Sequence, residues 1–359
     1  MLLFEASCFC LLEIHTSVIH RHINAPQVQI VFSKRKRRES QLRFLKMNKI
    51  VFLILQTAIQ LASATSLRSI KPNVLGLEVK DLNSHEVRLD CGEQFVGEDI
   101  HWKMNGEIIP EKGNHITVTI DGLRGGNFTC HKPNGDLLNY TLLLVHPVEF
   151  NKVVLTQSDD KEFVSCTAKN YSEHFHCSWK WHPKRIDRAV VYFSAIRNSS
   201  FINCTLDADI YGMTCVDVAY CPYSEESMSI NLTLLVRNEY RLEEHHRTFL
   251  IRDIVKPDKV TLTKIEDHVF KWSPPETWSY PCSYFPLSYE VKVIPDMDSN
   301  PDCDYMGRRV EKNETNETQY TVNKKAYKFC VRAQDPFTKT AWSDWSYHYH
   351  GKKHKQSSE

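Results

Sequence analysis

Hydrophobic and polar residues alternate in short runs along most of this chain, and turn-forming residues separate the runs. Successive side chains of a β-strand point to opposite faces, so this period of two predicts strands with one buried face. No long segment repeats its apolar residues with a helical period. An all-β chain built from sandwiches is therefore predicted, with strands in at least six runs: residues 87–91, 116–120, 153–155, 230–234, 289–293 and 320–322.

One apolar run near the N-terminus does not fit the alternating pattern. A short basic start at Met47 is followed by apolar residues 50–61 and by a small-x-small cleavage site at Ala62 to Ala64. This order predicts a secretory signal peptide at 47–64, whose apolar run is too short to span a bilayer. Residues 1–46 are then an upstream extension outside the mature protein. No later apolar run is long enough for a membrane helix.

The mature chain is expected to hold three modules, at residues 65–145, 146–255 and 256–350, followed by a polar tail at 351–359. In the first module, Cys91, Trp102 and Cys130 have the spacing of an immunoglobulin-like sandwich. A Cys91–Cys130 disulfide would join the two sheets there, and the indole would pack on it. Phe128 occupies the corner position where such sandwiches usually carry tyrosine.

The second and third modules are predicted to be fibronectin type III sandwiches. Cys166 and Cys177 precede Trp179, and their ten intervening residues suit a turn between neighbouring strands with a Cys166–Cys177 disulfide across them. A Cys204–Cys215 pair has the same spacing. Pro257 is expected to end the last strand of the second module and to fix the direction in which the chain leaves it.

Four cysteines remain without an assigned mate. Cys221 has no nearby partner, and an odd cysteine in an exported protein indicates an intermolecular bond or a capped thiol. Cys282, Cys303 and Cys330 form a trio with three pairings, which the sequence leaves open. Alternation in residues 327–333 places Cys330 on the outer strand face, so a disulfide through it would lie outside the sandwich core.

The same alternation places Arg332 outward, close in sequence to Trp342-Ser343-Asp344-Trp345-Ser346. In a ribbon with three residues per turn, Trp342 and Trp345 point the same way. Both indoles could then stack on the Arg332 guanidinium, with about 0.5–2 kcal/mol for each cation–π contact. An edge strand with two half-exposed aromatic residues is the alternative interpretation.

Composition supports export and argues against nucleic acid as a ligand. Of the 359 residues, 12 are cysteine and the formal net charge is +1. Ten cysteines lie after the signal peptide, which fits an oxidising compartment. Eight Asn-x-Ser/Thr sequons in the mature part suit a glycoprotein, although those beside cysteines could stay unused: Asn127, Asn139, Asn170, Asn198, Asn203, Asn231, Asn313 and Asn316.

Catalytic and metal-binding motifs are not found in the sequence. It has no Gly-rich phosphate loop, no Gly-x-Ser-x-Gly and no His-Glu-x-x-His. His174 and His176 would share one strand face, but two histidines beside a disulfide cysteine make a poor zinc site. His245 and His246 are interpreted as part of a solvated strand end. We therefore expect no enzymatic activity and no cofactor.

The order of these modules resembles the soluble class I cytokine receptors, whose hallmark is the Trp-Ser-x-Trp-Ser motif at 342–346. Local stretches are similar to the interleukin-12 beta-subunit family, and the likeness covers about residues 65–350. The stretches are residues 130–137, 166–172, 221–227, 249–258 and 331–335.

This resemblance implies a receptor-like beta subunit of a secreted heterodimer that signals through cell-surface cytokine receptor chains in immune regulation. A four-helix-bundle alpha subunit would bind at the elbow between the fibronectin modules, with Cys221 as the interchain cysteine. The implied pocket residues are Tyr171, Glu225, Tyr284, Asp335 and Phe337. Phe337 stands where the family often has tyrosine, which puts one polar contact in doubt. Residues that would contact the receptor cannot be carried over to the first module.

Asp335 carries two competing interpretations. A carboxylate there can accept a bidentate arginine from the alpha subunit. Alternatively, Asp335 followed by proline is a turn-forming residue.

A soluble alpha-type receptor that binds its cytokine without a covalent link is the second functional hypothesis, and an adhesion scaffold is the third. The identity of the alpha subunit and the existence of homodimers are left open.

Overall fold

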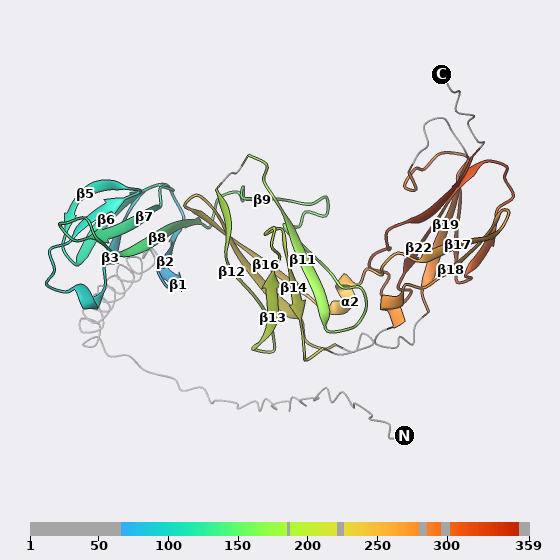
Figure 1. Ribbon diagram of the computed structural model, residues 1–359, viewed down its shortest axis with the longest axis horizontal. Helices are drawn as coiled ribbons and strands as arrows, with labels where there is room; N and C mark the ends of the chain where they lie inside the picture. Colours follow the sequence, from blue (N-terminus) through green and yellow to red (C-terminus); the bar gives the residue numbers. More distant parts are fainter. Residues whose placement is uncertain (1–65, 185–186, 221–225, 280–285, 296–301, 352–359) are drawn as a thin grey trace, which may run out of the picture. The chain divides into compact units, whose positions relative to one another are not determined.

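The computed structural model describes residues 66–184, 187–220, 226–279, 286–295 and 302–351. It is almost entirely β-structure, which confirms the predicted fold class (Figure 1). Several predictions fall outside the described residues: the upstream extension, the signal peptide, most of the polar tail, Cys221, Glu225, Cys282 and Tyr284. The chain divides into two compact units between Glu149 and Phe150, and each is described separately.

The first unit packs a sheet of six strands against a two-stranded sheet. In pairing order, the larger sheet contains β1 (Leu67–Lys71), β2 (Val74–Val79), β8 (Leu137–Pro147), β7 (Gly126–His131), β4 (His101–Met104) and β5 (Glu107–Lys112). The smaller sheet pairs β3 (Ser84–Asp90) with β6 (His115–Asp121). Alternation in β6 is regular, since its burial changes at every residue.

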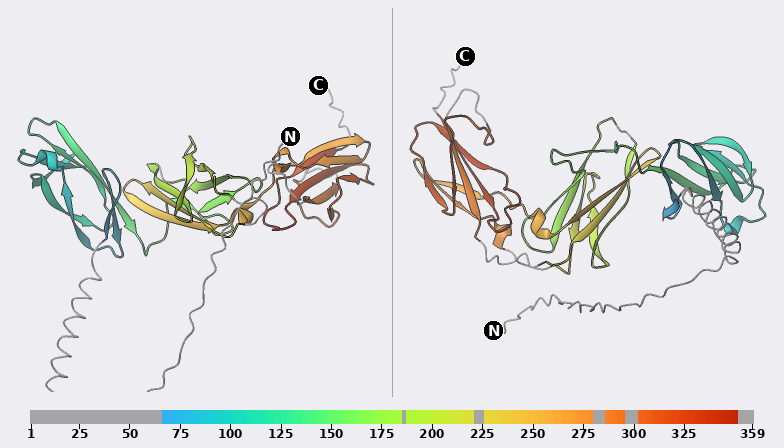
Figure 2. Two further views of the ribbon diagram at one scale, coloured as in Figure 1. Left: turned by 90° about the horizontal axis from the view of Figure 1, so that it is seen from below. Right: turned by 180° about the vertical axis from the view of Figure 1, so that it is seen from behind.

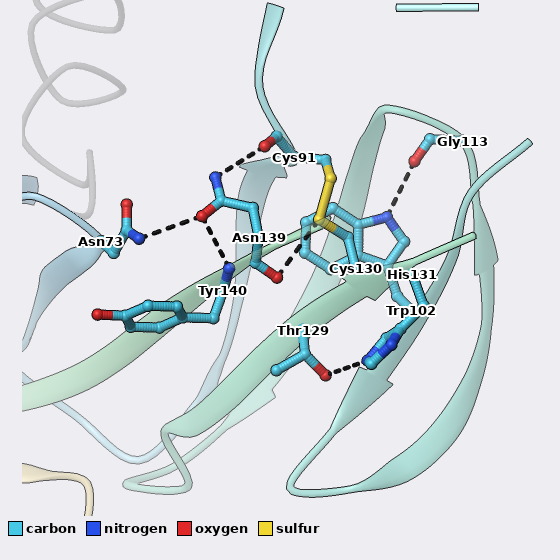
Figure 3. The surroundings of a disulfide bond; sticks show 9 residues. All are labelled: Asn73, Cys91, Trp102, Gly113, Thr129, Cys130, His131, Asn139 and Tyr140. Atoms are coloured by element: carbon cyan, nitrogen blue, oxygen red, sulfur yellow. Dashed lines mark hydrogen bonds between the residues drawn. A yellow bond between two sulfur atoms is a disulfide. The ribbon is translucent and has the colours of Figure 1, made fainter. Parts of the chain in front are cut away.

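A disulfide and an indole form the centre of this unit (Figure 3). Cys91, at the end of β3, is bonded to Cys130 in β7, and both residues are fully buried. Trp102 is fully buried as well, and its Nε1 donates to the Gly113 carbonyl at 2.9 Å. Phe128 is also fully buried, so its ring fills the core without the hydroxyl of a tyrosine.

The second unit contains two sandwiches. In the first, which we call the middle sandwich, one sheet has the order β10 (Val164–Thr167), β11 (His174–Trp181), β14 (Gly212–Val216) and β13 (Ser200–Leu206). Its other sheet contains β12 (Arg188–Arg197), β15 (Ile230–Asn238) and β16 (Arg241–Phe249). Disulfides Cys166–Cys177 and Cys204–Cys215 join directly paired residues of neighbouring strands.

The second sandwich of this unit, the C-terminal sandwich, also has two described sheets (Figure 2). One contains β17 (Thr261–Glu266), β18 (Val269–Ser273) and β21 (Gln319–Thr321). The other has the order β20 (Glu311–Thr315), β19 (Ser288–Pro295), β22 (Tyr327–Gln334) and β23 (Ser346–His350). Trp272 and Phe329 are buried between these sheets and belong to a core that continues into the middle sandwich.

The connection between the sandwiches differs from the prediction. The last strand of the middle sandwich ends at Phe249, so Pro257 does not end it. A single helical turn, α2 (Ile251–Ile254), follows, and its first turn is capped by the Asp253 carboxylate, which accepts from the Leu250 amide at 2.9 Å. Because Ile251 and Ile254 are both buried, this turn is held by packing as well as by its cap.

The strand predicted at residues 153–155 is also wrong in its position, because only β9 (Leu155–Thr156) pairs there. The Val153 and Val154 amides donate to the buried Glu243 carboxylate, at 2.6 and 3.0 Å, instead of to a strand. Burial alone would raise the pKa of Glu243, but these amide bonds, together with contact to His245, leave that pKa below its usual range.

His245 is buried rather than solvated, with 2% of its side chain exposed, so its interpretation as a solvated strand end is wrong. Its Nε2 lies 3.6 Å from Glu243, too far for a hydrogen bond, and Phe163 packs on the ring. Burial lowers the pKa of His245 below its ordinary 6.5, and the neighbouring Glu243 only partly opposes this shift. The folded protein therefore favours the neutral ring.

Acid is expected to destabilise the second unit through His245. The pKa of His245 is lower in the folded than in the unfolded chain. The stability that depends on a neutral His245 is therefore fully present above pH 6.5 and is lost as the pH falls below it. The pKa of Glu243 is also lowered in the folded chain, so a further part of the stability is lost below about pH 4.5. The thermal midpoint should fall between pH 7.5 and 5.5, and His245→Phe should reduce this fall. His246→Ala, at an exposed position, is the control; equal slopes in all three proteins would contradict the assignment.

Candidate functional site

The Trp-Ser-x-Trp-Ser segment forms a stack of cations and aromatic rings on the outer face of the C-terminal sandwich. The Arg332 guanidinium carbon lies 4.9 Å from the Trp342 ring centre and 4.3 Å from that of Trp345. Residues 340–345 lie outside the strands, as a three-residue ribbon requires. Trp345 also contacts Lys292, whose Nζ is 4.9 Å from the ring centre.

The two serines of the motif attach this segment to the sandwich. Ser343 bonds Ala333 twice, through its amide at 2.7 Å and through its hydroxyl, which accepts from the Ala333 amide at 2.9 Å. The Ser346 hydroxyl donates to the Val260 carbonyl at 2.7 Å. The serines therefore position the indoles by binding the main chain of two different segments.

The cysteine trio is resolved in part. Cys303 is bonded to Cys330, and both pack with Ile294, Val310 and Trp345 in a small cluster apart from the main core. Cys330 thus faces outward from its sheet and is still fully buried, because the loop that carries Cys303 and the indole of Trp345 cover it. Alternation correctly placed it on the outer face, but cannot show what covers that face.

Arg332→Ala should destabilise the C-terminal sandwich by about 1–4 kcal/mol, because two cation–π contacts are lost. The Glu290 carboxylate, 1% exposed, would also lose its contacts of 3.1 and 3.2 Å with the guanidinium. Arg332→Lys should restore only part of the loss, since an ammonium has no plane to stack. The check is thermal denaturation, with Lys328→Ala, which removes a cation–π contact to exposed Tyr347, as the control. Equal midpoints for the two alanine variants would contradict this role.

A second candidate site lies at the elbow, which we define as residues 168–173, 250–260, 276–279 and 335–345. These segments come from both sandwiches of the second unit and bond one another. Ala168 and Val255 form an isolated parallel bridge, and the Thr340 hydroxyl donates to the Val255 carbonyl at 2.7 Å. Lys256 pairs with Asp344 at 2.8 Å. The elbow is therefore held by hydrogen bonds and an ion pair in addition to the apolar core that runs through it.

Tyr171 and Asp335, 164 residues apart in sequence, meet inside this elbow. The Tyr171 hydroxyl donates to Asp335 Oδ2, and 3% of Tyr171 and none of Asp335 is exposed. Asp335 Oδ2 also accepts from the Thr338 hydroxyl at 3.0 Å, and Oδ1 accepts from the Phe337 amide at 2.9 Å. Both carboxylate oxygens of Asp335 therefore accept hydrogen bonds from within the chain.

Asp335 is fully buried, and its carboxylate is already bonded within the chain. The bond from the Phe337 amide is the turn contact that an aspartate makes two residues ahead, so the turn interpretation describes its geometry. A partner arginine would have to displace the Tyr171 or Thr338 hydroxyl to reach the carboxylate. Phe337, with 60% of its surface exposed, is the only one of the described pocket residues that presents a large apolar surface.

Other contacts in the elbow were not expected from the sequence, which indicated Asn170 only as a sequon. The Tyr171 ring meets Trp278, 5% exposed, edge-on at 6.2 Å between ring centres. Asn170 donates through Nδ2 to the Thr277 carbonyl at 2.6 Å. Trp278 and Thr277 lie in η4 (Glu276–Ser279), a 3-10 turn. A tryptophan that follows the Ser-Pro-Pro-Glu-Thr run at 273–277 was the available signal, since tryptophan buries a large area and contributes strongly to cores and interfaces.

The sequons differ in accessibility. Asn170 is 8% exposed and its amide is bonded on both sides, so a glycan there would have to replace the bond from Nδ2 to the Thr277 carbonyl, and its glycosylation stays a prediction. Asn139 is half-buried, and its Nδ2 donates to the Cys91 carbonyl at 2.8 Å beside the first-unit disulfide (Figure 3). Asn127 is also half-buried. The five exposed sequon residues are Asn198, Asn203, Asn231, Asn313 and Asn316.

Comparison with known proteins places the chain in a family. Residues 161–238, within the middle sandwich, match the family model for the cytokine interleukin-12p40 C-terminus. The human interleukin-12 subunit beta is 31% identical over 266 residues, which is 65% of this chain and 77% of the human protein. The chain belongs to the interleukin-12 subunit beta family.

Two further relatives carry the same name. Interleukin-12 subunit beta of Lama glama is 30% identical over 263 residues, covering 65% of this chain and 77% of that protein. The Mesocricetus auratus protein is 28% identical over 294 residues, covering 74% of this chain and 86% of its own length. This family is one of cytokine subunits, a non-enzyme kind of protein.

Two kinds of feature are absent among the described residues. No group of three or more histidine, cysteine, aspartate or glutamate side chains there could hold a metal ion. In that same part of the chain, no helix has both the length and the apolarity needed to cross a membrane.

Proposed function

We propose that this chain is the secreted, receptor-like beta subunit of a heterodimeric cytokine. It binds a four-helix-bundle alpha subunit at the elbow, and the dimer signals through cell-surface cytokine receptor chains. The observation that carries the proposal is the contact between Tyr171 and Asp335. Loops of two sandwiches converge there on one buried carboxylate, at positions that the family resemblance assigns to alpha-subunit binding.

Binding would proceed by exchange at the Asp335 carboxylate. A guanidinium from the alpha subunit takes the place of the Tyr171 hydroxyl on Oδ2, while the Phe337 amide keeps Oδ1 in position. An arginine pairs with a carboxylate in a fixed, bidentate geometry, so it gains both energy and orientation over a neutral hydroxyl. The exposed Phe337 ring supplies apolar area at the rim of the same site.

Cys221 would then hold the two subunits together after docking. A covalent link makes rebinding intramolecular, so a complex of moderate intrinsic affinity persists at low concentration. Cys221, Glu225 and Tyr284 lie outside the described residues, and their roles are part of the proposal.

Co-expression in a mammalian secretory cell line tests this proposal. The chain is produced with each candidate helical alpha subunit, and the medium is run on reducing and non-reducing gels. We expect a secreted species of higher mass that separates on reduction and whose covalent link is lost in Cys221→Ser. Co-elution of the wild-type chain with a helical cytokine and no reducible link would instead support the soluble alpha-type receptor. Secretion with no helical partner in any combination would count against both.

A further inference from the structure

A shallow groove on the middle sandwich is lined by residues of β12 and β13. The two strands pair only up to Ala195 and Ile202, and from Asn203 onward β13 pairs with β14 instead. Residues 192–194 of β12 are therefore not paired with Asn203 and Cys204 of β13. The space between them is about 490 Å³ and is lined by both segments.

The outer face of this groove is aromatic and exposed. Phe201 is 73% exposed and Tyr192 is 37% exposed, on the face shared with Ile196, the direct partner of Phe201. These exposed rings offer apolar area to a ligand that lies over the groove. The residues around these rings indicate which kind of ligand would lie there.

Asn203 lies on the same outward face as Phe201. Burial in β13 alternates so that Phe201, Asn203 and Thr205 are exposed while Ile202 is buried. Residues two apart on a strand are about 7 Å apart, a distance that one sugar ring spans. Asn203-Cys204-Thr205 is a sequon, and the Cys204–Cys215 disulfide holds it in register with β14.

We propose that Asn203 carries an N-linked glycan whose first sugar lies on the Phe201 ring and covers the groove between β12 and β13. The face of an aromatic ring is electronegative, and it attracts the polarised C–H bonds of a pyranose face. Carbohydrate is favoured over a protein partner because a second exposed sequon, Asn198, lies in the turn between the same two strands. A protein docked there would meet two glycan attachment points.

The modification itself is a group transfer. A bond forms between Asn203 Nδ2 and C1 of the first sugar, and the bond from C1 to the oxygen of a polyprenyl diphosphate-linked oligosaccharide breaks. The lipid diphosphate leaves, and Nδ2 loses one proton to the medium. No oxidation or reduction takes place.

This inference depends on the export that the proposed function requires, and the two can fail separately. If peptide mass spectrometry of the chain from mammalian cells finds no sequon occupied, export through the glycosylating compartment fails and the inference falls with it. If Asn313 is occupied and Asn203 is not, only the inference falls. Asn313 is a matched comparison, because Glu311 stands where Asn203 has Phe201.

The contact with Phe201 is tested by trimming the glycan on the intact secreted chain. An endoglycosidase that leaves one sugar should leave the thermal midpoint unchanged. An amidase that removes the whole glycan should lower it by about 2–4 °C if Asn203 carries the effect. Thr205→Ala, which cannot be glycosylated at Asn203, should begin at the lower midpoint. Phe201→Thr should abolish the response, whereas Phe201→Trp should keep it.

Two results would overturn the contact. One is an occupied Asn203 for which Phe201→Thr and wild type respond equally to full glycan removal. The other is concentration-dependent dimerisation of the glycosylated chain that Phe201→Thr abolishes, because the groove would then belong to a second copy. Sedimentation velocity over a tenfold concentration range measures the second result.

Discussion

Replacing Arg197 with alanine is expected to destabilise the second unit by about 3–5 kcal/mol, the typical cost of removing one member of a buried ion pair. Arg197 is 7% exposed and lies between two buried carboxylates, Asp217 at 2.8 Å and Glu226 at 2.6 Å. The Asp217 contact has the distance of an ion pair without the angle of a hydrogen bond, whereas Glu226 accepts a hydrogen bond.

The cost is high because both carboxylates stay behind. Asp217 is 2% exposed and Glu226 is 4% exposed, so neither can regain water without opening the structure. The Met228 carbonyl would also lose a bond of 2.9 Å. Asp217 precedes Cys221 in sequence and Glu226 follows it, so the same arginine anchors both ends of that segment. Less disulfide-linked heterodimer is therefore expected from Arg197→Ala as well.

Chemical denaturation of the purified chain measures the loss. Arg237→Ala is the matched control, because Arg237 makes an ion pair of similar length, 2.9 Å, with the exposed Asp187. An exposed pair contributes at most about 1 kcal/mol. Adding Asp217→Asn and Glu226→Gln to Arg197→Met should recover part of the stability, since the uncompensated charges are removed. Similar losses for Arg197→Ala and Arg237→Ala would contradict the buried-pair account.

Asp335→Asn is expected to weaken alpha-subunit binding by about 2–5 kcal/mol, which corresponds to a loss of affinity of about 30-fold or more. The amide keeps an oxygen for the Phe337 amide, so the turn can persist. It loses the charge that a guanidinium would pair with. This variant therefore separates the partner role of Asp335 from its role in the turn.

Tyr171→Phe provides the opposite case. If the Tyr171 hydroxyl only holds Asp335 until an arginine arrives, its removal should cost about 1.5–3 kcal/mol of stability and leave binding unchanged or tighter. Asp344→Asn, at an exposed carboxylate paired with Lys256, is the control for loss of negative charge near the elbow. The affinity of each variant is measured by its binding to alpha subunit immobilised on a sensor surface. Binding by Asp335→Asn equal to wild type would leave Asp335 as a turn residue only.

Local pattern was sufficient for most strands. In β6 and β15, alternating apolar residues are buried because one face of each strand packs on a core, and the period of two follows directly. The cysteine spacings around Cys166 and Cys204 were equally local, since each disulfide joins directly paired residues of adjacent strands. The 153–155 strand was misplaced because a carboxylate from β16, about 90 residues away, takes the amides of Val153 and Val154.

By itself, the sequence determined the all-β class, the outward position of Arg332 and Cys330, and the residues that relate the chain to its family. These depend on short-range periodicity and on motifs read within a few residues. Only the tertiary structure decided that Asp335 is enclosed by Tyr171, that Arg197 holds two buried carboxylates, and that Phe201 and Asn203 share an open groove. Such arrangements depend on which distant segments converge and on how much water they exclude, and neither quantity is encoded in the neighbouring residues of the chain.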